Sequence, residues 1–413
     1  MSSTNRIILA LVLGLAAGAA IAAMEQSGLA RIVAILQPVG TLWVNALRMT
    51  VIPLVFAVLV TGIATAASAA NAGKLAARAM VTFGLVLLAA VAATVIVVPA
   101  ILAAFPIPES AAAALRAGAL SRHESLPPVA PLRDWLTGII PVNPVAAAAE
   151  GAVLPLIVFA LLFAFAIPRL PAESRERLTG FFDAVATAMV TIVQWVLRVA
   201  PLGVFALALG VGFHGGLGAA GALFYYIVLL SVLCLLATGA MYPLAAASKA
   251  LTFREFARGA APAQVVAAST QSSLATLPAM IDAAQGSLRV PSGIVGIVLP
   301  LAVSLFRVST AVANLAAAIF VAALYGIPLS PAQLATAALV SVATSIGSVG
   351  VSSQVSYFFG VMPICLALGL PVEVLALLLA VEVLPDIFRT ICNVTADLAV
   401  TVVLGRERRA AAR

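Results

Sequence analysis

Charged residues are scarce in this sequence. Only 9% of its 413 residues are charged, whereas 63% are hydrophobic. Soluble domains typically have about 25% charged residues, and their charges cover a water-facing surface. No long polar domain interrupts the hydrophobic segments here. The scarcity therefore excludes an ordinary soluble protein and predicts an all-α polytopic membrane protein.

Cysteine and histidine are also rare, with three and two residues. Cys234, Cys365 and Cys392 stand alone in apolar segments, without the spacing of a disulfide framework or a metal site. We therefore expect no metal and no cofactor. The net charge of +7 could suggest nucleic acid, but most cations lie in short connections, as the positive-inside rule produces. The expected partners are a lipid bilayer and a small molecule, with no nucleic acid.

The first six hydrophobic spans alternate with short connections. Connections with excess Lys and Arg follow the second, fourth and sixth spans, and another basic stretch ends the sequence. A longer stretch with no net charge, Pro106 to Asp134, follows the third span. This pattern predicts an even number of crossings and two cytoplasmic termini, in a plasma (inner) membrane. The predicted spans are about 5–24, 36–66, 78–104, 136–168, 181–210 and 217–247.

The last third of the sequence contains two Ser/Thr-rich interruptions, 269–278 and 341–354. Their apolar flanks are too short to cross a bilayer singly, so each interruption predicts a re-entrant helical hairpin with a polar tip. Each hairpin is followed by a span that contains a Phe-Arg pair. The two units therefore form an inverted repeat, whose broken helices meet at the bilayer midplane and build a binding site. The predicted elements are hairpin 1 at 253–283, span 7 at 291–326, hairpin 2 at 331–366 and span 8 at 371–409.

Span 8 carries four polar side chains, Asp386, Arg389, Asn393 and Asp397, at intervals of 3, 4 and 4 residues. This spacing places them on one helical face. A charge at the bilayer centre costs about 2.5–3.5 kcal/mol on insertion scales, so this face must line the protein interior or a watery cavity. A substrate site is the favoured interpretation. A structural ion pair between Asp386 and Arg389 is the alternative.

These segments resemble the dicarboxylate/amino-acid:cation symporter family, which includes glutamate transporters and an archaeal aspartate transporter. The similarity covers nearly the whole chain and includes LRMTVIPLVFA in span 2, STQSSLATLP in hairpin 1, SIGSVGV in hairpin 2 and FRTICNVTADL in span 8. The resemblance implies eight spans, two opposed hairpins, a homotrimer and elevator-type transport. It implies a scaffold of residues 1–70 and 106–210, and a transport domain of residues 71–105 and 211–413.

The resemblance also implies roles for individual residues. Asp386 matches the carboxylate that binds the substrate α-amino group, and Arg389 matches the arginine that grips the side-chain carboxylate. Asp397 matches a sodium-ligating carboxylate. The hairpin 1 tip is implied to meet the substrate α-carboxylate through backbone N–H groups. The other candidate substrate-binding residues are Ser272, Ser273, Thr310, Val349, Gly350, Thr390 and Asn393.

Span 7 departs from the family pattern. Where the family has Asn-Met-Asp-Gly-Thr, this sequence has residues 306–310, FRVST, so two sodium ligands are replaced by apolar residues. We hypothesise that Arg307 is a tethered cation that pairs with Asp397, which would make transport sodium-independent. Two alternatives stay open: Arg307 contacts the substrate carboxylate, or it faces an aqueous crevice while backbone carbonyls bind sodium. Glu382 is a candidate proton carrier, and an ordinary polar helix face is the other interpretation.

The chemistry of the site predicts the substrate. Asp386 favours a cationic group and Arg389 an anionic one, so an acidic amino acid such as aspartate or glutamate supplies the matching charges. A C4-dicarboxylate is the alternative, because the hairpin 2 tip departs from the family pattern. An anion channel is the alternative of another class. No nucleophile–base signature of a hydrolase is present, so we do not expect an enzyme.

Overall fold

The computed structural model describes residues 3–24, 27–71, 73–118, 137–249, 251–346 and 353–410. Within these ranges all regular secondary structure is helical. Seven of the helical segments described there are long and apolar enough to cross a membrane. The fold class predicted from the sequence, an all-α polytopic membrane protein, is confirmed. The shorter apolar helices are Val153–Arg169, Ala200–Gly215, Pro331–Ile346 and Val355–Ala367.

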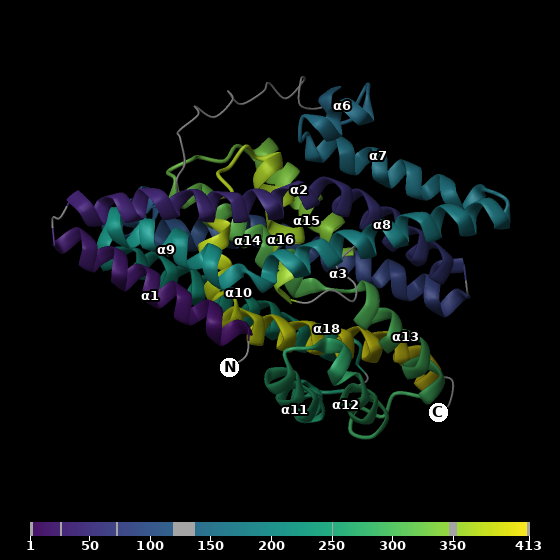
Figure 1. Ribbon diagram of the computed structural model, residues 1–413. Helices are drawn as coiled ribbons and strands as arrows, with labels where there is room; N and C mark the ends of the chain where they lie inside the picture. Colours follow the sequence, from purple (N-terminus) through teal and green to yellow (C-terminus); the bar gives the residue numbers. More distant parts are fainter. Residues whose placement is uncertain are drawn as a thin grey trace.

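The first half of the chain is built around a long helix, α2, which packs against α7, α8 and α9 (Figure 1). Residues 136–168, one of the expected spans, do not form one continuous helix, since α6 and α7 are separate there. The helices of this half are α1 (Ser3–Ala23), α2 (Ser27–Asn71), α3 (Lys74–Ala104), α4 (Glu109–Gly118), α6 (Pro144–Ala149), α7 (Val153–Ala166), η1 (Ile167–Arg169), α8 (Ala172–Arg198) and α9 (Ala200–Gly215).

The prediction of one continuous span at 181–210 is wrong. The helix α8 begins earlier, at Ala172, and ends at Arg198, and α9 begins at Ala200. Pro201 lies in the first turn of α9, a position where its missing N–H removes no helical hydrogen bond. The proline therefore favours a new helix at this point.

The new helix α9 packs along α1 through glycines. A methyl group on Gly14 would collide with Ala208, one on Gly18 would collide with the backbone at Leu209, and one on Gly212 would collide with the backbone of α1. Small residues let two membrane helices approach backbone to backbone, so the Gly14-x-x-x-Gly18 spacing holds this pair together.

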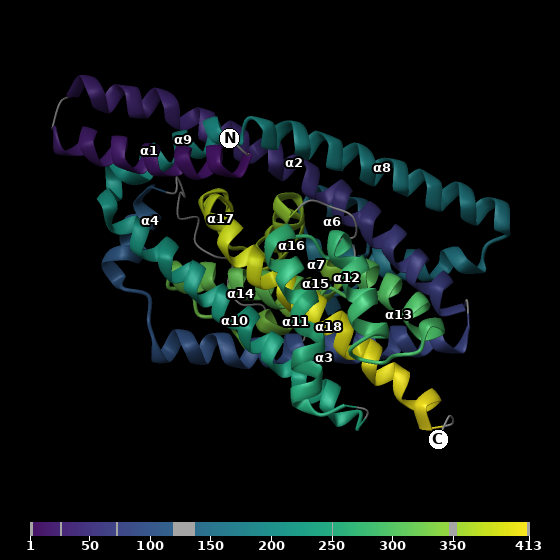
Figure 2. The ribbon, with the colours of Figure 1, turned by 90° about the horizontal axis from the view of Figure 1, so that it is seen from below.

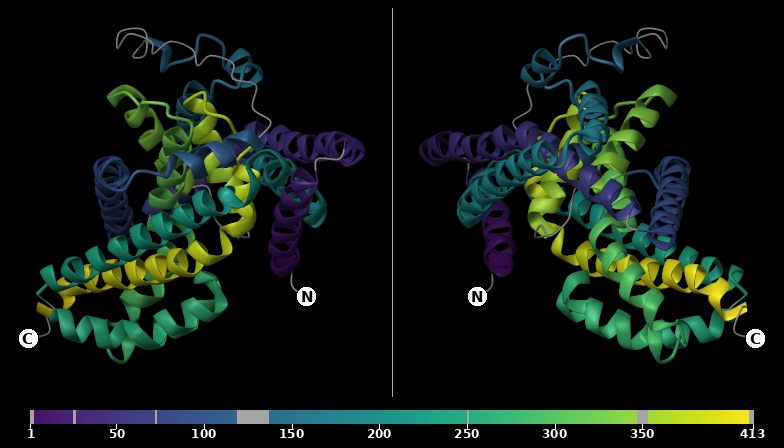
Figure 3. Two further views of the ribbon diagram at one scale, coloured as in Figure 1. Left: turned by 90° about the vertical axis from the view of Figure 1, so that its left-hand side faces the viewer. Right: turned by 90° about the vertical axis from the view of Figure 1, so that its right-hand side faces the viewer.

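The second half of the chain is organised around α18, which contacts α10, α11, α12, α13 and α14. Figure 2 shows α18 crossing the middle of this half, and Figure 3 shows α10 and α18 running side by side, away from α1. Its helices are η2 (Gly216–Gly218), α10 (Ala219–Ala247), α11 (Phe253–Thr270), α12 (Ser273–Gln285), α13 (Ser292–Leu305), α14 (Val308–Leu324), α15 (Pro331–Ile346), α16 (Ser353–Ala367), α17 (Leu375–Val381) and α18 (Val383–Ala410).

Hairpin 1 consists of α11 and α12. Its entry is fixed by a capping box, in which the Thr252 backbone N–H donates to Glu255 at 2.8 Å and the Glu255 N–H donates to the Thr252 hydroxyl at 3.2 Å. Its tip turns sharply at Gln271, whose φ of 50° is left-handed. Hairpin 2 consists of α15 and α16, and residues 347–352 of its Ser/Thr-rich interruption lie outside the described residues.

Spans 7 and 8 are both broken, and only the break in span 7 coincides with the Phe-Arg pair of its span, because Phe388 and Arg389 lie inside α18. Span 7 is divided into α13 and α14 at Phe306 and Arg307, and span 8 is divided into α17 and α18 at Glu382. Phe306 fills the first break by stacking on Phe83 of α3, with ring centroids 4.8 Å apart. The breaks leave helix termini and charged side chains inside the protein, which positions the candidate site.

Candidate functional site

A polar cavity of about 500 Å³ lies where hairpin 1, the break in span 7 and α18 meet. Polar groups provide most of its lining, in contrast to the apolar surface of the helices around it. A concave site with convergent polar groups is a candidate for small-molecule binding, and the charges in this one suit a charged ligand. It is lined by Gln194 of α8, Gln271, Ser272, Ser273 and Leu274 of hairpin 1, Arg307, Ser309 and Thr310 of span 7, Ser356 of α16, and Asp386, Arg389, Thr390 and Asn393 of α18.

The tip of hairpin 1 brings the N-terminus of α12 to this cavity. Ser272 caps α12 by accepting a hydrogen bond from the Ala275 N–H at 3.2 Å, so the next residues, Ser273 and Leu274, begin the helix at the cavity wall. The first N–H groups of a helix have no partner within the helix and carry partial positive charge. This end of α12 can therefore hold a carboxylate.

The break in span 7 brings a second helix N-terminus to the same place. Arg307 is the residue before α14, and the Ser309 N–H in its first turn donates to Asn393 Oδ1 at 3.0 Å. Asn393 thus ties α18 to the start of α14. The Ser341 hydroxyl of hairpin 2 donates to the Ala311 carbonyl at 2.7 Å, which holds the same turn from the other side.

The polar face predicted for span 8 is present on one uninterrupted helix, α18. Asp386 and Arg389 are 9% and 5% exposed, and both line the cavity. The Thr390 hydroxyl donates to the Asp386 carbonyl at 2.9 Å, so its side chain lies against the helix backbone. The cavity therefore holds a carboxylate and a guanidinium one turn apart, charges that match an ammonium and a carboxylate of a ligand.

The guanidinium of Arg389 is held on its other side by Glu382. Arg389 Nη1 lies 2.9 Å from Glu382 Oε1, and the Tyr226 hydroxyl donates to Glu382 Oε2 at 2.7 Å. Arg389 Nη2 also donates to Asn314 Oδ1 at 2.6 Å. Glu382 is 2% exposed, so its interpretation as a polar helix face is wrong. We call Glu382, Arg389, Asn314 and Tyr226 the arginine clasp.

The contact expected between Arg307 and Asp397 is not formed. Among the described residues, neither carboxylate oxygen of Asp397 has a hydrogen-bond partner, although the side chain is only 1% exposed. Arg307 is attracted electrostatically by Asp397 and by Asp386, and repelled by Arg389. Arg307 precedes α14 and lies at the cavity wall. Its charge therefore attracts Asp397 from a distance, and the two side chains form no direct ion pair.

The structure brings most of the predicted site residues together. Seven of the nine candidate substrate-binding residues line the cavity, and so does Arg307. Val349 and Gly350 lie outside the described residues. Asp397 lies further along α18, and Glu382 lies behind Arg389. The seven are Ser272, Ser273, Thr310, Asp386, Arg389, Thr390 and Asn393.

Sequence reasoning missed several residues of the site. Gln194 comes from α8, and Asn314 and Tyr226 complete the arginine clasp. The sequence context of Asn314 could have identified it. It is a lone amide in an alanine-rich membrane span, where a polar side chain needs a partner. Tyr226 carried no such signal, since tyrosine is common near membrane surfaces.

Comparison with known proteins agrees with this architecture. The family model of the sodium:dicarboxylate symporter family matches residues 4–407. The fold and the cavity define a membrane transporter rather than an enzyme, and the chain belongs to this family.

Relatives of two substrate classes match at similar levels. The proton/glutamate-aspartate symporter of Escherichia coli (strain K12) is 27% identical over 97% of this chain and 92% of its own length. The proton/sodium-glutamate symport protein of Bacillus subtilis (strain 168) is 27% identical over 90% of this chain and 86% of its own. The C4-dicarboxylate transport protein of Deinococcus radiodurans is 26% identical over 98% of this chain and 89% of its own. This chain is thus similar to symporters of acidic amino acids and of dicarboxylates.

Proposed function

We propose that this protein is a secondary symporter whose substrate is an acidic amino acid such as aspartate or glutamate. The observation that carries the proposal is the juxtaposition of Asp386, two arginines and the α12 N-terminus around one cavity. The ammonium of the substrate pairs with Asp386. One carboxylate takes the N–H groups of α12 and the other takes a guanidinium.

A C4-dicarboxylate symporter is the second candidate, because the relatives include C4-dicarboxylate transport proteins at comparable identity. A dicarboxylate leaves Asp386 without an ammonium to bind and places negative charge near it, which weakens binding. Uptake into proteoliposomes discriminates the two. Radiolabelled aspartate should be taken up saturably and be competed by glutamate but only weakly by succinate. The reverse order of competition would favour the dicarboxylate, and non-saturable anion flux would favour a channel.

We further propose that transport is sodium-independent, with Arg307 standing in for sodium. The fixed charge of Arg307 attracts Asp397 and Asp386, and the sodium-binding side chains of span 7 are replaced by apolar residues. A guanidinium stays protonated at all physiological pH values, so it supplies its charge without an ion gradient. Substrate affinity should be unchanged when sodium replaces choline. A large gain in affinity on adding sodium contradicts the proposal.

We propose that protons supply the coupling, through the arginine clasp. The Glu382 carboxylate and a substrate carboxylate compete for the same guanidinium, since Arg389 faces both the cavity and Glu382. Protonation of Glu382 removes one competitor and releases Arg389 to the substrate. Substrate and proton then bind together and leave together, which is the requirement for symport. A proton gradient alone should drive uptake above equilibrium, and a sodium gradient alone should not.

We propose an elevator-type homotrimer in a plasma (inner) membrane, with both termini cytoplasmic. Large apolar side chains on α2 and α8, including Ile35, Leu42 and Trp195, are exposed and available to lipid or to other copies.

Gln194 lines the cavity from the proposed scaffold and Ser273 from the proposed transport domain. A maleimide crosslink between Gln194→Cys and Ser273→Cys should therefore block transport. If the crosslinked protein still transports, the proposed movement of the transport domain against the scaffold is contradicted. Light scattering in mild detergent tests whether the protein is a trimer.

A further inference from the structure

A small polar pocket lies outside the substrate site, at the turn that joins α7 to α8. It has a volume of about 280 Å³ and is formed by the last turn of the α2 span, the η1 turn and the first turns of α8. Its wall combines two charged side chains, two hydroxyl groups and an apolar base. The lining residues are Ala64, Thr65, Ile167, Pro168, Arg175, Glu176 and Thr179.

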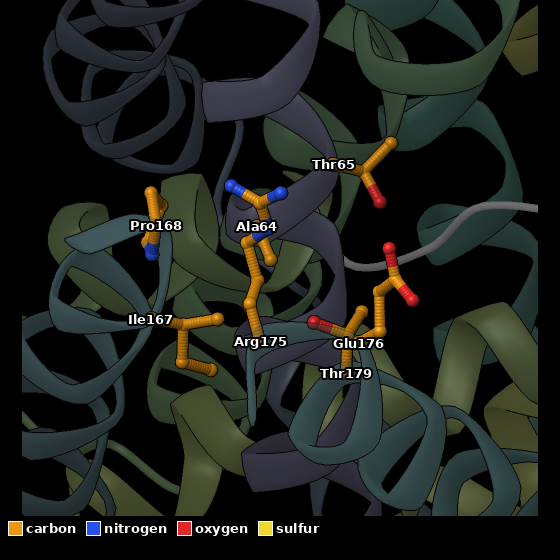
Figure 4. A pocket seen from close by; sticks show the side chains of 7 residues that line it. All are labelled: Ala64, Thr65, Ile167, Pro168, Arg175, Glu176 and Thr179. Atoms are coloured by element: carbon orange, nitrogen blue, oxygen red, sulfur yellow. The ribbon is translucent and has the colours of Figure 1, made fainter. Parts of the chain in front are cut away.

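The two charges in this pocket are arranged as a pair of complementary binding groups. Figure 4 shows the side chains of Arg175 and Glu176 extending from adjacent positions of α8, with the guanidinium and the carboxylate apart from each other. Within the described part of the chain, neither side chain makes a hydrogen bond or an ion pair. Arg177, by contrast, pairs with Glu173 one turn earlier. The pocket thus offers a donor for an anion and an acceptor for a cation.

The backbone around the pocket is fixed. The Leu170 N–H donates to the Ile167 carbonyl at 3.0 Å, and the Arg175 N–H donates to the Pro171 carbonyl at 3.0 Å. Pro168 and Pro171 restrict the turn further, because a proline ring sets φ. The charged groups are therefore presented by a rigid frame.

The pocket lies beside the end of a helical segment that is long and apolar enough to cross a membrane. Thr65 is near the end of the α2 span, which extends to Ala67. Phe165 on α7 and Phe181 on α8 are 55% and 59% exposed and lie on the two helices that the turn connects. Exposed phenylalanines of this kind suit acyl chains, while polar and charged groups beside them suit the head-group layer.

We infer that this pocket binds the phosphoethanolamine head group of a membrane phospholipid. The phosphate pairs with Arg175, and the Thr179 hydroxyl lines the same pocket and can donate to it. The primary ammonium pairs with Glu176. A choline head group has no N–H to donate, and a glycerol head group has no cation. The site therefore discriminates among head groups that share one phosphate, and it ties α2 and α8 to the bilayer surface.

Thermal unfolding of the purified, delipidated protein tests this inference. Phosphatidylethanolamine in mixed micelles should raise the unfolding temperature by several degrees, more than phosphatidylcholine or phosphatidylglycerol with the same acyl chains. Soluble glycerophosphoethanolamine and inorganic phosphate should have little effect, because the acyl chains contribute to binding. Equal shifts with the three lipids overturn the head-group assignment, and a full response to the soluble compounds overturns the lipid assignment.

Two variants and a matched control separate this pocket from general attraction to lipid. Arg175→Gln should lose the response to both phosphatidylethanolamine and phosphatidylglycerol. Glu176→Gln should lose only the preference for phosphatidylethanolamine. Arg177→Gln removes a neighbouring cation that faces Glu173 and should respond like the wild type. If Arg175→Gln responds fully, the pocket is not the site. Should either variant not fold, native mass spectrometry of the wild type with the three lipids still decides the head-group assignment, which equal binding of the three would overturn.

Discussion

Replacing Glu382 with glutamine tests the coupling proposal most directly. The change keeps the shape of the side chain and an acceptor for the Tyr226 hydroxyl, and it removes the charge that holds Arg389 at 2.9 Å. Arg389 retains its hydrogen bond to Asn314 at 2.6 Å. The guanidinium is then permanently available to a substrate carboxylate. The variant should bind substrate and exchange it, but it should not accumulate it against a gradient.

The expected magnitude follows from the number of protons that bind. If each substrate brings one proton to Glu382, the binding free energy changes by about 1.4 kcal/mol per pH unit, which is tenfold in Kd. The sign is fixed as well. The substrate-bound state holds the extra proton, so wild-type affinity rises as pH falls, over the range in which Glu382 is ionised in the free protein. The Glu382→Gln variant should show a flat dependence.

Isothermal titration calorimetry of the purified protein between pH 5.5 and 8.5 measures this slope. Glu373→Gln is the matched control, because it removes a partly exposed carboxylate nine residues earlier and should keep the wild-type slope. A wild-type slope of zero, or an unchanged slope in Glu382→Gln, refutes the reasoning.

Leaving Arg389 without its ion pair can cost about 3–5 kcal/mol of stability. Tyr226→Phe, which keeps the charge, should therefore be measured beside it and should keep the slope.

Two other substitutions test how the site is held. Gly360→Ala should lower the unfolding temperature and the affinity for acidic substrates. The added methyl group would collide with the Asn314 amide, and the side chain of Asn314 anchors Arg389. Gly296→Ala is the control, because Gly296 has open space beside it, and it should change neither quantity. Asn393→Ala should cost about 1–3 kcal/mol in thermal unfolding and weaken substrate binding, since it leaves the buried Ser309 N–H without its acceptor. If either variant unfolds at the same temperature as the wild type, the argument for that residue is contradicted.

Local sequence patterns were sufficient to predict the class of this protein and the main elements of its site. Charge is so costly inside a bilayer that few explanations exist for Asp386, Arg389 and Asn393 on one face of an apolar helix. The Ser/Thr-rich interruption predicted the hairpin whose tip turns at Gln271, because short apolar segments cannot cross alone. These features depend on local spacing and composition, which a sequence contains in full.

The pairing of the charges, by contrast, depends on how the helices pack. The spacing of span 8 left a structural ion pair between Arg389 and Asp386, one turn away, as an alternative to a substrate site. Its partners are instead Glu382 at the break before α18 and Asn314 on α14, and Glu382 is held in turn by Tyr226, which lies 156 residues away. A contact of this kind depends on how helices pack around α18, and no local pattern encodes it. The same packing keeps Arg307 at the cavity wall rather than against Asp397, because the break before α14 sets its position.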